Sequence, residues 1–151
     1  TEELGIPIFR SPTVFQCNGK HLYVGHGDGL GPGDRRYKVI KKVFSNPVCQ
    51  WLFQWLHPNV GMAIANKWSG SSRKSSDRTE ASFKGDDEWL IQYIRSIEAQ
   101  HHHDHYIFGH RHLPIDERID DTHYVNLGDW LKHQRFATFD GSDLHLERYE
   151  G

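Results

Sequence analysis

The chain has 151 residues, 36% of them hydrophobic, and a formal net charge of −2, since 18 Lys and Arg residues nearly balance 20 Asp and Glu residues. This length corresponds to one domain. The near-neutral charge gives no basic field to gather nucleic acid, so no nucleic-acid partner is expected. Two cysteines exclude a cysteine-based zinc finger and a disulfide framework, whereas the 12 histidines suggest a metal site or an acid–base site.

β-Structure is predicted for the start of the chain. Short strands are expected at 6–9, 13–16 and 20–24, and Asn18-Gly19 is a strong signal for a tight hairpin turn. The third strand runs directly into the glycine-rich loop Gly25-His26-Gly27-Asp28-Gly29. Rigid sheets present functional groups on loops at strand ends, and glycine lets the backbone approach a ligand closely. This loop is therefore a candidate functional segment.

A helical insert is predicted over about 34–84. Helical spacing of apolar residues indicates one helix at 35–44, a second helix that begins at Pro47 and a third that begins at Pro58. Three short helices separated by prolines are more typical of an insert than of a core layer.

Two tryptophans, Trp51 and Trp55, share the apolar stripe of the second helix. Such a stripe is more often core or a helix-packing surface than a ligand groove. Polar residues interrupt the apolar stretch 48–65, so it is not expected to span a membrane. The loop 69–84 carries a local positive charge that would suit a phosphate, from Arg73, Lys74 and Arg78.

The second half of the chain contains another loop of the same kind. A helix with acidic residues in its first turn is expected at 86–100, and a strand at 105–108. Gly109-His110-Arg111-His112 follows that strand. The run His101-His102-His103-Asp104-His105 is expected to be a solvated edge rather than a site.

The tail is predicted to be an antiparallel meander with a turn at Asp140-Gly141. An unpaired sheet edge invites self-association, so a dimer through that edge is a further expectation. The period-2 segments are 115–119, 123–127, 135–139 and 143–149.

The two glycine–histidine loops are the candidate metal site. On an extended segment His110 and His112 would project to the same side, and with His26 they could hold one tetrahedral zinc ion. The carboxylates that usually complete a hydrolytic two-metal site are not obvious. The loop candidates are Asp28, Asp34 and Asp129.

Gly25-His26 and Gly109-His110-Arg111-His112, in this order and widely separated, resemble the last two motifs of the calcineurin-like metallophosphoesterases. The stretch from Gly25 to Asp34, with its helical insert, resembles the branch of that family that hydrolyses UDP-2,3-diacylglucosamine in Gram-negative bacteria. The resemblance implies cleavage of the substrate's diphosphate to lipid X and UMP in lipid A biosynthesis. It also implies a cytoplasmic location, with the insert contacting the inner membrane peripherally.

The resemblance assigns roles to individual residues. His26 and His110 would bind the second of two divalent cations, expected to be Mn²⁺, and His112 the first. Asp34 would lie near the glucosamine or diphosphate of a UDP-sugar lipid. Substrate contacts are also expected from Arg73, Lys74, Arg78, Trp51 and Trp55.

The family's early Asp-x-His, Gly-Asp-x-x-Asp and Gly-Asn-His-Asp/Glu motifs are absent from the start of this chain. We therefore expect residues 1–151 to be the C-terminal portion of a metallophosphoesterase αββα sandwich, of mixed α/β (α+β) class, and to be inactive alone. Three alternatives stay open: a phosphoesterase acting on another phosphoester or nucleotide, a metal-free scaffold of the same fold, and a histidine-rich metal buffer.

Overall fold

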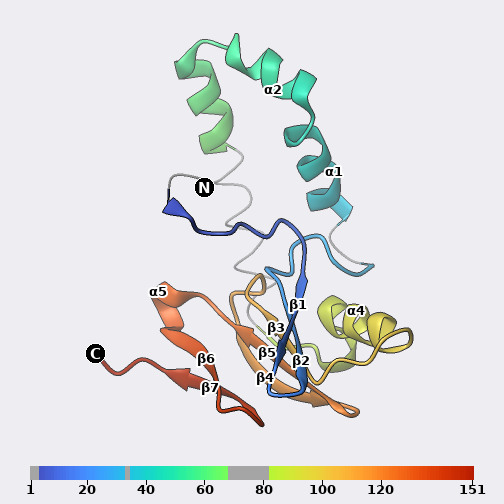
Figure 1. Ribbon diagram of the computed structural model, residues 1–151. Helices are drawn as coiled ribbons and strands as arrows, with labels where there is room; N and C mark the ends of the chain where they lie inside the picture. The colour runs from blue at the N-terminus through green and yellow to red at the C-terminus, as the bar shows by residue number, and fades with distance from the viewer. Residues whose placement is uncertain (1–3, 33–34, 68–81) are drawn as a thin grey trace.

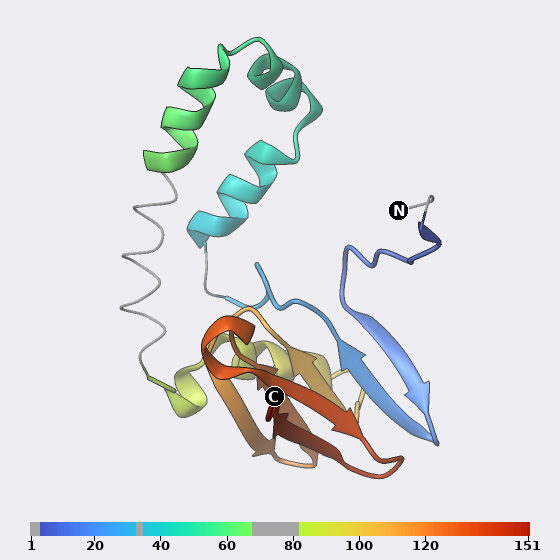
Figure 2. The ribbon, with the colours of Figure 1, turned by 90° about the vertical axis from the view of Figure 1, so that its left-hand side faces the viewer.

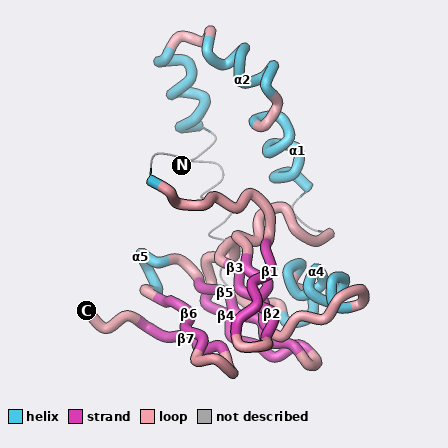
Figure 3. Tube along the Cα trace, in the orientation of Figure 1, coloured by secondary structure: helices cyan, strands magenta, loops and turns pink. Residues whose placement is uncertain are grey.

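The computed structural model describes residues 4–32, 35–67 and 82–151 (Figure 1). It consists of a layered body and a helical arm that extends away from the body, as a second view shows (Figure 2). Strands are confined to the body, whereas the described part of the arm is helical (Figure 3). The mixed α/β class expected from the sequence is confirmed.

The body is built on a five-stranded mixed sheet with the strand order β1-β2-β3-β5-β4. The inner pairs β2–β3 and β3–β5 are parallel, and the outer pairs β1–β2 and β4–β5 are antiparallel. The strand bounds are β1 Thr13–Cys17, β2 Lys20–Val24, β3 His105–Phe108, β4 Pro114–Ile119 and β5 Thr122–Leu127.

The β1–β2 hairpin forms as predicted. Asn18 and Gly19 have φ angles of 49° and 79°, as a two-residue turn with a left-handed backbone requires. The strand expected at 6–9 is wrong, because these exposed residues join no strand. Pro7 has no amide hydrogen to donate to a ladder, which weakens the β-signal of its apolar neighbours.

The expected single meander of the tail is also wrong. Strands β6 (Arg135–Phe139) and β7 (Leu144–Arg148) form a separate two-stranded sheet, while β5 pairs with β3 and β4. The short helix α5 (Trp130–His133), followed by Gln134 at φ 51°, separates β5 from β6. The predicted turn at Asp140 is confirmed, since its carboxylate accepts hydrogen bonds from the amides two and three residues later.

One face of the five-stranded sheet is covered by α4 (Trp89–Glu98). Leu90 and Ile94, one helical turn apart, are fully buried against Tyr106, Phe108 and Tyr124. The predicted helix starts later than expected, because Gly85–Asp87 form a short 3-10 turn, η2, ahead of it. The β6–β7 sheet lies on the opposite face of the five-stranded sheet, where the ring of Phe139 contacts that of His105 (Figure 1).

The arm contains the three predicted helices. They are α1 (Arg35–Phe44), α2 (Pro47–Gln54) and helical residues 58–67. Asn46 caps α2 by accepting two amide hydrogen bonds, and Pro47 occupies the first turn as predicted. Trp51 and Trp55 are 55% and 76% exposed, so their interpretation as core is wrong for the described chain. No described helix is long and apolar enough to cross a membrane.

The histidine run is not a uniformly solvated edge. His101 and His102 are exposed, but His103 and His105 are buried. His103 Nδ1 lies 3.1 Å from the Tyr106 hydroxyl. His105 is the first residue of β3, and its ring lies 5.5 Å from the ring of Phe139 in β6, between the two sheets. The prediction of a solvated edge is therefore wrong for two of the four histidines in the run.

Candidate functional site

The two glycine–histidine loops lie side by side at the carboxyl ends of two parallel inner strands of the sheet. Parallel strands β2 and β3 are neighbours, so their carboxyl ends, at Val24 and Phe108, bring the following loops together. The backbone carbonyl of His26 accepts hydrogen bonds from the amides of Gly109 at 3.1 Å and His110 at 2.9 Å. These bonds fix one loop on the other.

The imidazoles of His26 and His110 converge. His26 Nε2 and His110 Nδ1 are 3.3 Å apart, and the ring centroids are 5.1 Å apart. Two nitrogens that each lie about 2.1 Å from one cation, at a tetrahedral angle, are about 3.4 Å apart. The observed pair of donors thus fits two positions of a divalent-cation site.

Gly27 explains how the loops approach so closely. Its φ is 100°, and an added Cβ would lie 3.3 Å from His110 Cβ and 3.5 Å from Leu90 Cδ2. A larger residue at this position would be strained in its backbone and crowded by both neighbours. The sequence signal for the site, glycine beside histidine, thus has a steric cause.

His112 does not lie on the extended segment that the sequence predicts. Residues 110–111 form a turn and His112 has a φ of 53°. The prediction that His110 and His112 project to the same side of an extended segment is therefore wrong. Within the described ranges, no group of three or more His, Cys, Asp or Glu side chains is arranged to hold a metal ion. The structure brings together His26 and His110, and the role of His112 stays a prediction.

Behind the histidines, Arg111 points into the body. Its guanidinium Nη2 donates to Glu88 Oε1 at 2.8 Å, and both side chains are nearly inaccessible, with 5% and 2% exposed. Burial raises the pKa of the nearby Tyr124 hydroxyl well above its usual range, and the Glu88 carboxylate raises it further. Sequence reasoning missed Glu88, since acidic residues at the start of a helix are an ordinary N-terminal signal.

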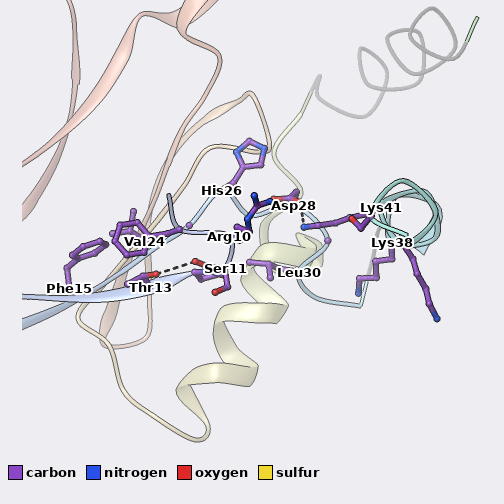
Figure 4. A pocket seen from close by; sticks show the side chains of 17 residues that line it. Arg10, Ser11, Thr13, Phe15, Val24, His26, Asp28, Leu30, Lys38 and Lys41 are labelled. Atoms are coloured by element: carbon purple, nitrogen blue, oxygen red, sulfur yellow. Dashed lines mark hydrogen bonds and ion pairs between the residues drawn. The ribbon is translucent and has the colours of Figure 1, made fainter. Parts of the chain in front are cut away.

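A cleft of about 670 Å³ opens beside His26 (Figure 4). Lys41 points from α1 to Asp28, whose carboxylate lies 2.6 Å from its ammonium group. Lys38 donates to the carbonyl of Gly31 at 2.5 Å, so two lysines attach α1 to the His26 loop. Sequence reasoning missed this basic face, although its helical spacing was readable. The basic residues lining the cleft are Arg10, Lys38, Lys41 and Lys42.

The predicted substrate residues are not brought together in the described chain. Trp51 of α2 and Trp55, which follows the end of α2, contact each other with ring centroids 5.8 Å apart, in the arm and away from the sheet (Figure 1). The remaining four positions, Asp34, Arg73, Lys74 and Arg78, lie outside the described residues.

Comparison with known proteins identifies bacterial relatives. No protein-family model matches the chain. It is 31% identical to a UDP-2,3-diacylglucosamine hydrolase of Porphyromonas gingivalis, over 99% of this chain and 63% of the relative. It is 29% identical to the enzyme of that name from Azotobacter vinelandii, over 95% of this chain and 60% of the relative.

The chain spans about three-fifths of the length of these curated relatives. A third relative of the same name, from a Shewanella species, is 27% identical over 93% of this chain and 59% of its own length. The resemblance suggested by the stretch from Gly25 to Asp34 and its helical insert is confirmed: this chain is similar, along nearly its whole length, to bacterial UDP-2,3-diacylglucosamine hydrolases.

Proposed function

We propose that this chain supplies metal-ligating and substrate-binding residues to a hydrolase that cleaves the diphosphate of UDP-2,3-diacylglucosamine, giving lipid X and UMP in lipid A biosynthesis. The observation that carries the proposal is the convergence of His26 Nε2 and His110 Nδ1 at 3.3 Å where two parallel strands end. The similarity to hydrolases of that name supports the substrate.

His26 and His110 would hold one divalent cation and His112 another, with Mn²⁺ as the proposed metal. Such cations neutralise charge on a phosphoryl group and make a water molecule more acidic. Two imidazoles do not complete a coordination shell, so the remaining positions require further ligands. The contribution of this chain is to hold imidazole donors rigidly at the sheet edge.

The basic cleft supports the binding of a diphosphate beside these donors. Arg10, Lys38 and Lys42 line it together with His26, and Lys41 is paired with Asp28. Positive groups in a cleft concentrate an anionic substrate and balance its charge. Further contacts to the diphosphate or the glucosamine are proposed from Asp34, Arg73, Lys74 and Arg78.

The exposed apolar arm supports the binding of acyl chains. We propose that the arm covers the substrate's acyl groups and rests on the cytoplasmic face of the inner membrane, with Trp51 and Trp55 in the apolar contact. A basic helix such as α1 adds attraction to anionic lipid. If Trp51→Ser/Trp55→Ser leaves affinity for acylated substrate and for anionic lipid vesicles unchanged, this role is wrong.

The edge of the five-stranded sheet supports a second proposal about assembly. Within the described strands, β1 pairs only with β2. Val14 and Phe15 on this strand are 44% and 40% exposed. We propose pairing of this edge with a second copy. Light scattering should report a dimer that dissociates in a Val14→Lys variant, and a concentration-independent monomer would contradict pairing.

The test of function is Mn²⁺-dependent release of UMP from UDP-2,3-diacylglucosamine by the complete reading frame that encodes this chain. His26→Ala should lower turnover by more than the 10–100-fold typical of residues one step removed from a metal. His145→Ala is the matched control, since His145 is an exposed histidine of β7, hydrogen-bonded to Asp140.

Other outcomes favour the alternatives. Equal turnover of an unacylated nucleotide would indicate another phosphoester substrate. No turnover and no metal binding would favour a metal-free scaffold. Stoichiometric metal binding that depends on residues 101–105, without turnover, would favour a metal buffer.

A further inference from the structure

A buried ion pair links the candidate metal loop to the start of α4. Arg111 stands between His110 and His112 in the sequence, and its guanidinium lies 2.8 Å from Glu88 Oε1. The same guanidinium donates to the Ser82 carbonyl at 3.0 Å. The side chain between the two histidines is therefore anchored in the body by a charged partner.

Glu88 is itself held in place from several sides. Its Oε1 accepts a hydrogen bond from the Lys84 amide at 3.2 Å. Its backbone amide donates to the Gly85 carbonyl at 3.0 Å, and its carbonyl accepts from the Gln92 amide at 3.0 Å. The carboxylate that meets Arg111 thus projects from the fixed junction between η2 and α4.

The residue after Glu88 contacts the histidine directly. The Trp89 ring lies 5.8 Å from the His110 ring, edge to face. Gly31 also packs here, since a Cβ at that position would lie 2.5 Å from the Trp89 carbonyl oxygen. The start of α4 is consequently packed against the loop that carries His110 and against the loop that follows His26.

We infer that Glu88 is a positioning residue: through Arg111 it sets the orientation of the His110 and His112 segment toward His26. This inference rests on the proposed metal-ligating role of His110. Neither Glu88 nor Arg111 has to touch metal or substrate.

A charged pair suits this role better than an apolar contact. An arginine guanidinium is planar and donates in fixed directions, so its carboxylate partner determines the angle as well as the distance. A left-handed residue such as His112, with φ at 53°, also needs its surroundings to hold it. The pair therefore restrains the loop that carries both histidines.

The first experiment needs no metal. Long-range ¹H–¹⁵N spectra of the histidine rings are recorded on the 151-residue chain and on Glu88→Gln. We expect the His110 and His112 signals to move while those of His145 stay. Unchanged His110 and His112 signals would overturn the inference, whatever the outcome for the proposed function.

In the second experiment Mn²⁺ is titrated into the same proteins. Glu88→Gln should weaken binding by about 10–100-fold. Arg111→Lys should do the same with a nearly unchanged unfolding midpoint, because lysine keeps the charge but lacks the planar fork. Asp86→Asn is the matched control, since it removes an exposed ion pair with Arg95 at the same helix start and should leave binding unchanged.

The two experiments distinguish a failure of the positioning role from a failure of the proposed function. Wild-type affinity in both Glu88→Gln and Arg111→Lys would overturn the positioning role. If the protein encoded by the complete reading frame binds no Mn²⁺, the proposed function fails, and the metal-free spectra still decide the role of Glu88. If Glu88→Gln does not fold, the Arg111→Lys variant tests the positioning role in both experiments.

Discussion

The body and the arm bury their apolar residues to very different extents. In the body, Leu90, Ile94 and Phe108 are completely inaccessible. In the arm, Gly61 alone is buried among residues 38–67, and large apolar side chains such as Trp55 are exposed. The body supplies its own core, whereas the described arm has none.

This difference separates rigidity from binding capacity. A buried core fixes the strand ends and hence the two histidine loops. Large exposed apolar patches are uncommon on monomeric proteins, so the exposed apolar residues of the arm support the binding role proposed for it. A ligand that covered the arm would stabilise the folded state by mass action. We therefore expect core substitutions to affect folding and arm substitutions to affect binding.

The largest expected effect is the truncation of a core aromatic. Phe108→Ala should lower the free energy of unfolding by about 3–5 kcal/mol, because a completely buried ring leaves a cavity. Urea denaturation measures the loss. The same change in the arm, Phe53→Ala, removes a ring that is 46% exposed and should cost under about 1 kcal/mol. Equal costs would contradict the comparison.

A smaller effect is expected where the arm's base meets α4. Gly31→Ala should lower the free energy of unfolding by about 1–3 kcal/mol, because φ is 75° and the added Cβ would meet the Trp89 carbonyl oxygen at 2.5 Å. Gly19→Ala is the control, with φ at 79° and no atom near the added Cβ. If thermal denaturation gives the two variants the same loss, steric contact at Gly31 is unimportant.

A buried histidine of the body makes stability depend on pH. Burial lowers the pKa of His105, and the neighbouring His123 lowers it further. In the unfolded chain His105 binds a proton near pH 6.5, whereas in the folded chain it binds the proton only at a lower pH. The contribution of neutral His105 to the free energy of unfolding is therefore complete above pH 6.5 and decreases as the pH falls below it. His105→Leu should therefore lose less stability than wild type between pH 7 and pH 5.

The exposed His145 should behave in the opposite way. The hydrogen bond to Asp140 raises the pKa of His145, so its contribution is present below pH 6.5 and decreases as the pH rises through the folded-state pKa. Denaturation at several pH values should show opposite signs for the two substitutions. The same sign for both would contradict the placement of His105 between the sheets.

The smallest stability effect is expected in the apolar part of the arm. Trp55→Ser should change the free energy of unfolding by less than about 0.5 kcal/mol, because the ring is 76% exposed. Binding of anionic vesicles should nevertheless weaken, which a sedimentation assay measures. A large loss of stability without a change in vesicle binding would show that the tryptophan is structural.

Local signals allowed part of the fold to be predicted. Asn18-Gly19 demands a left-handed turn, and Pro47 after Asn46 starts a helix, so both features follow from neighbouring residues alone. The two histidine loops were recognisable because each follows an apolar strand and contains glycine. The convergence of their imidazoles depends on β2 and β3 being neighbours, which no local pattern encodes.

The errors came from tertiary contacts. His105 is polar but is buried, because the β6–β7 sheet covers it with Phe139. Trp51 lies on an apolar stripe of a kind that is more often core or a helix-packing surface, yet its ring is 55% exposed in the described chain. The Glu88–Arg111 pair joins residues 23 positions apart, and neither residue alone signals a buried partner.

The central claim, that His26 and His110 form a metal-binding pair, has a direct test. Mn²⁺ is paramagnetic and broadens the NMR signals of nearby nuclei, so it can be titrated into the ¹⁵N-labelled chain while the histidine rings are observed. We predict that the His26 and His110 signals broaden first, and that a His26→Ala variant loses this effect at His110. Broadening that begins at His101 and His102 and leaves His26 and His110 sharp would contradict the claim.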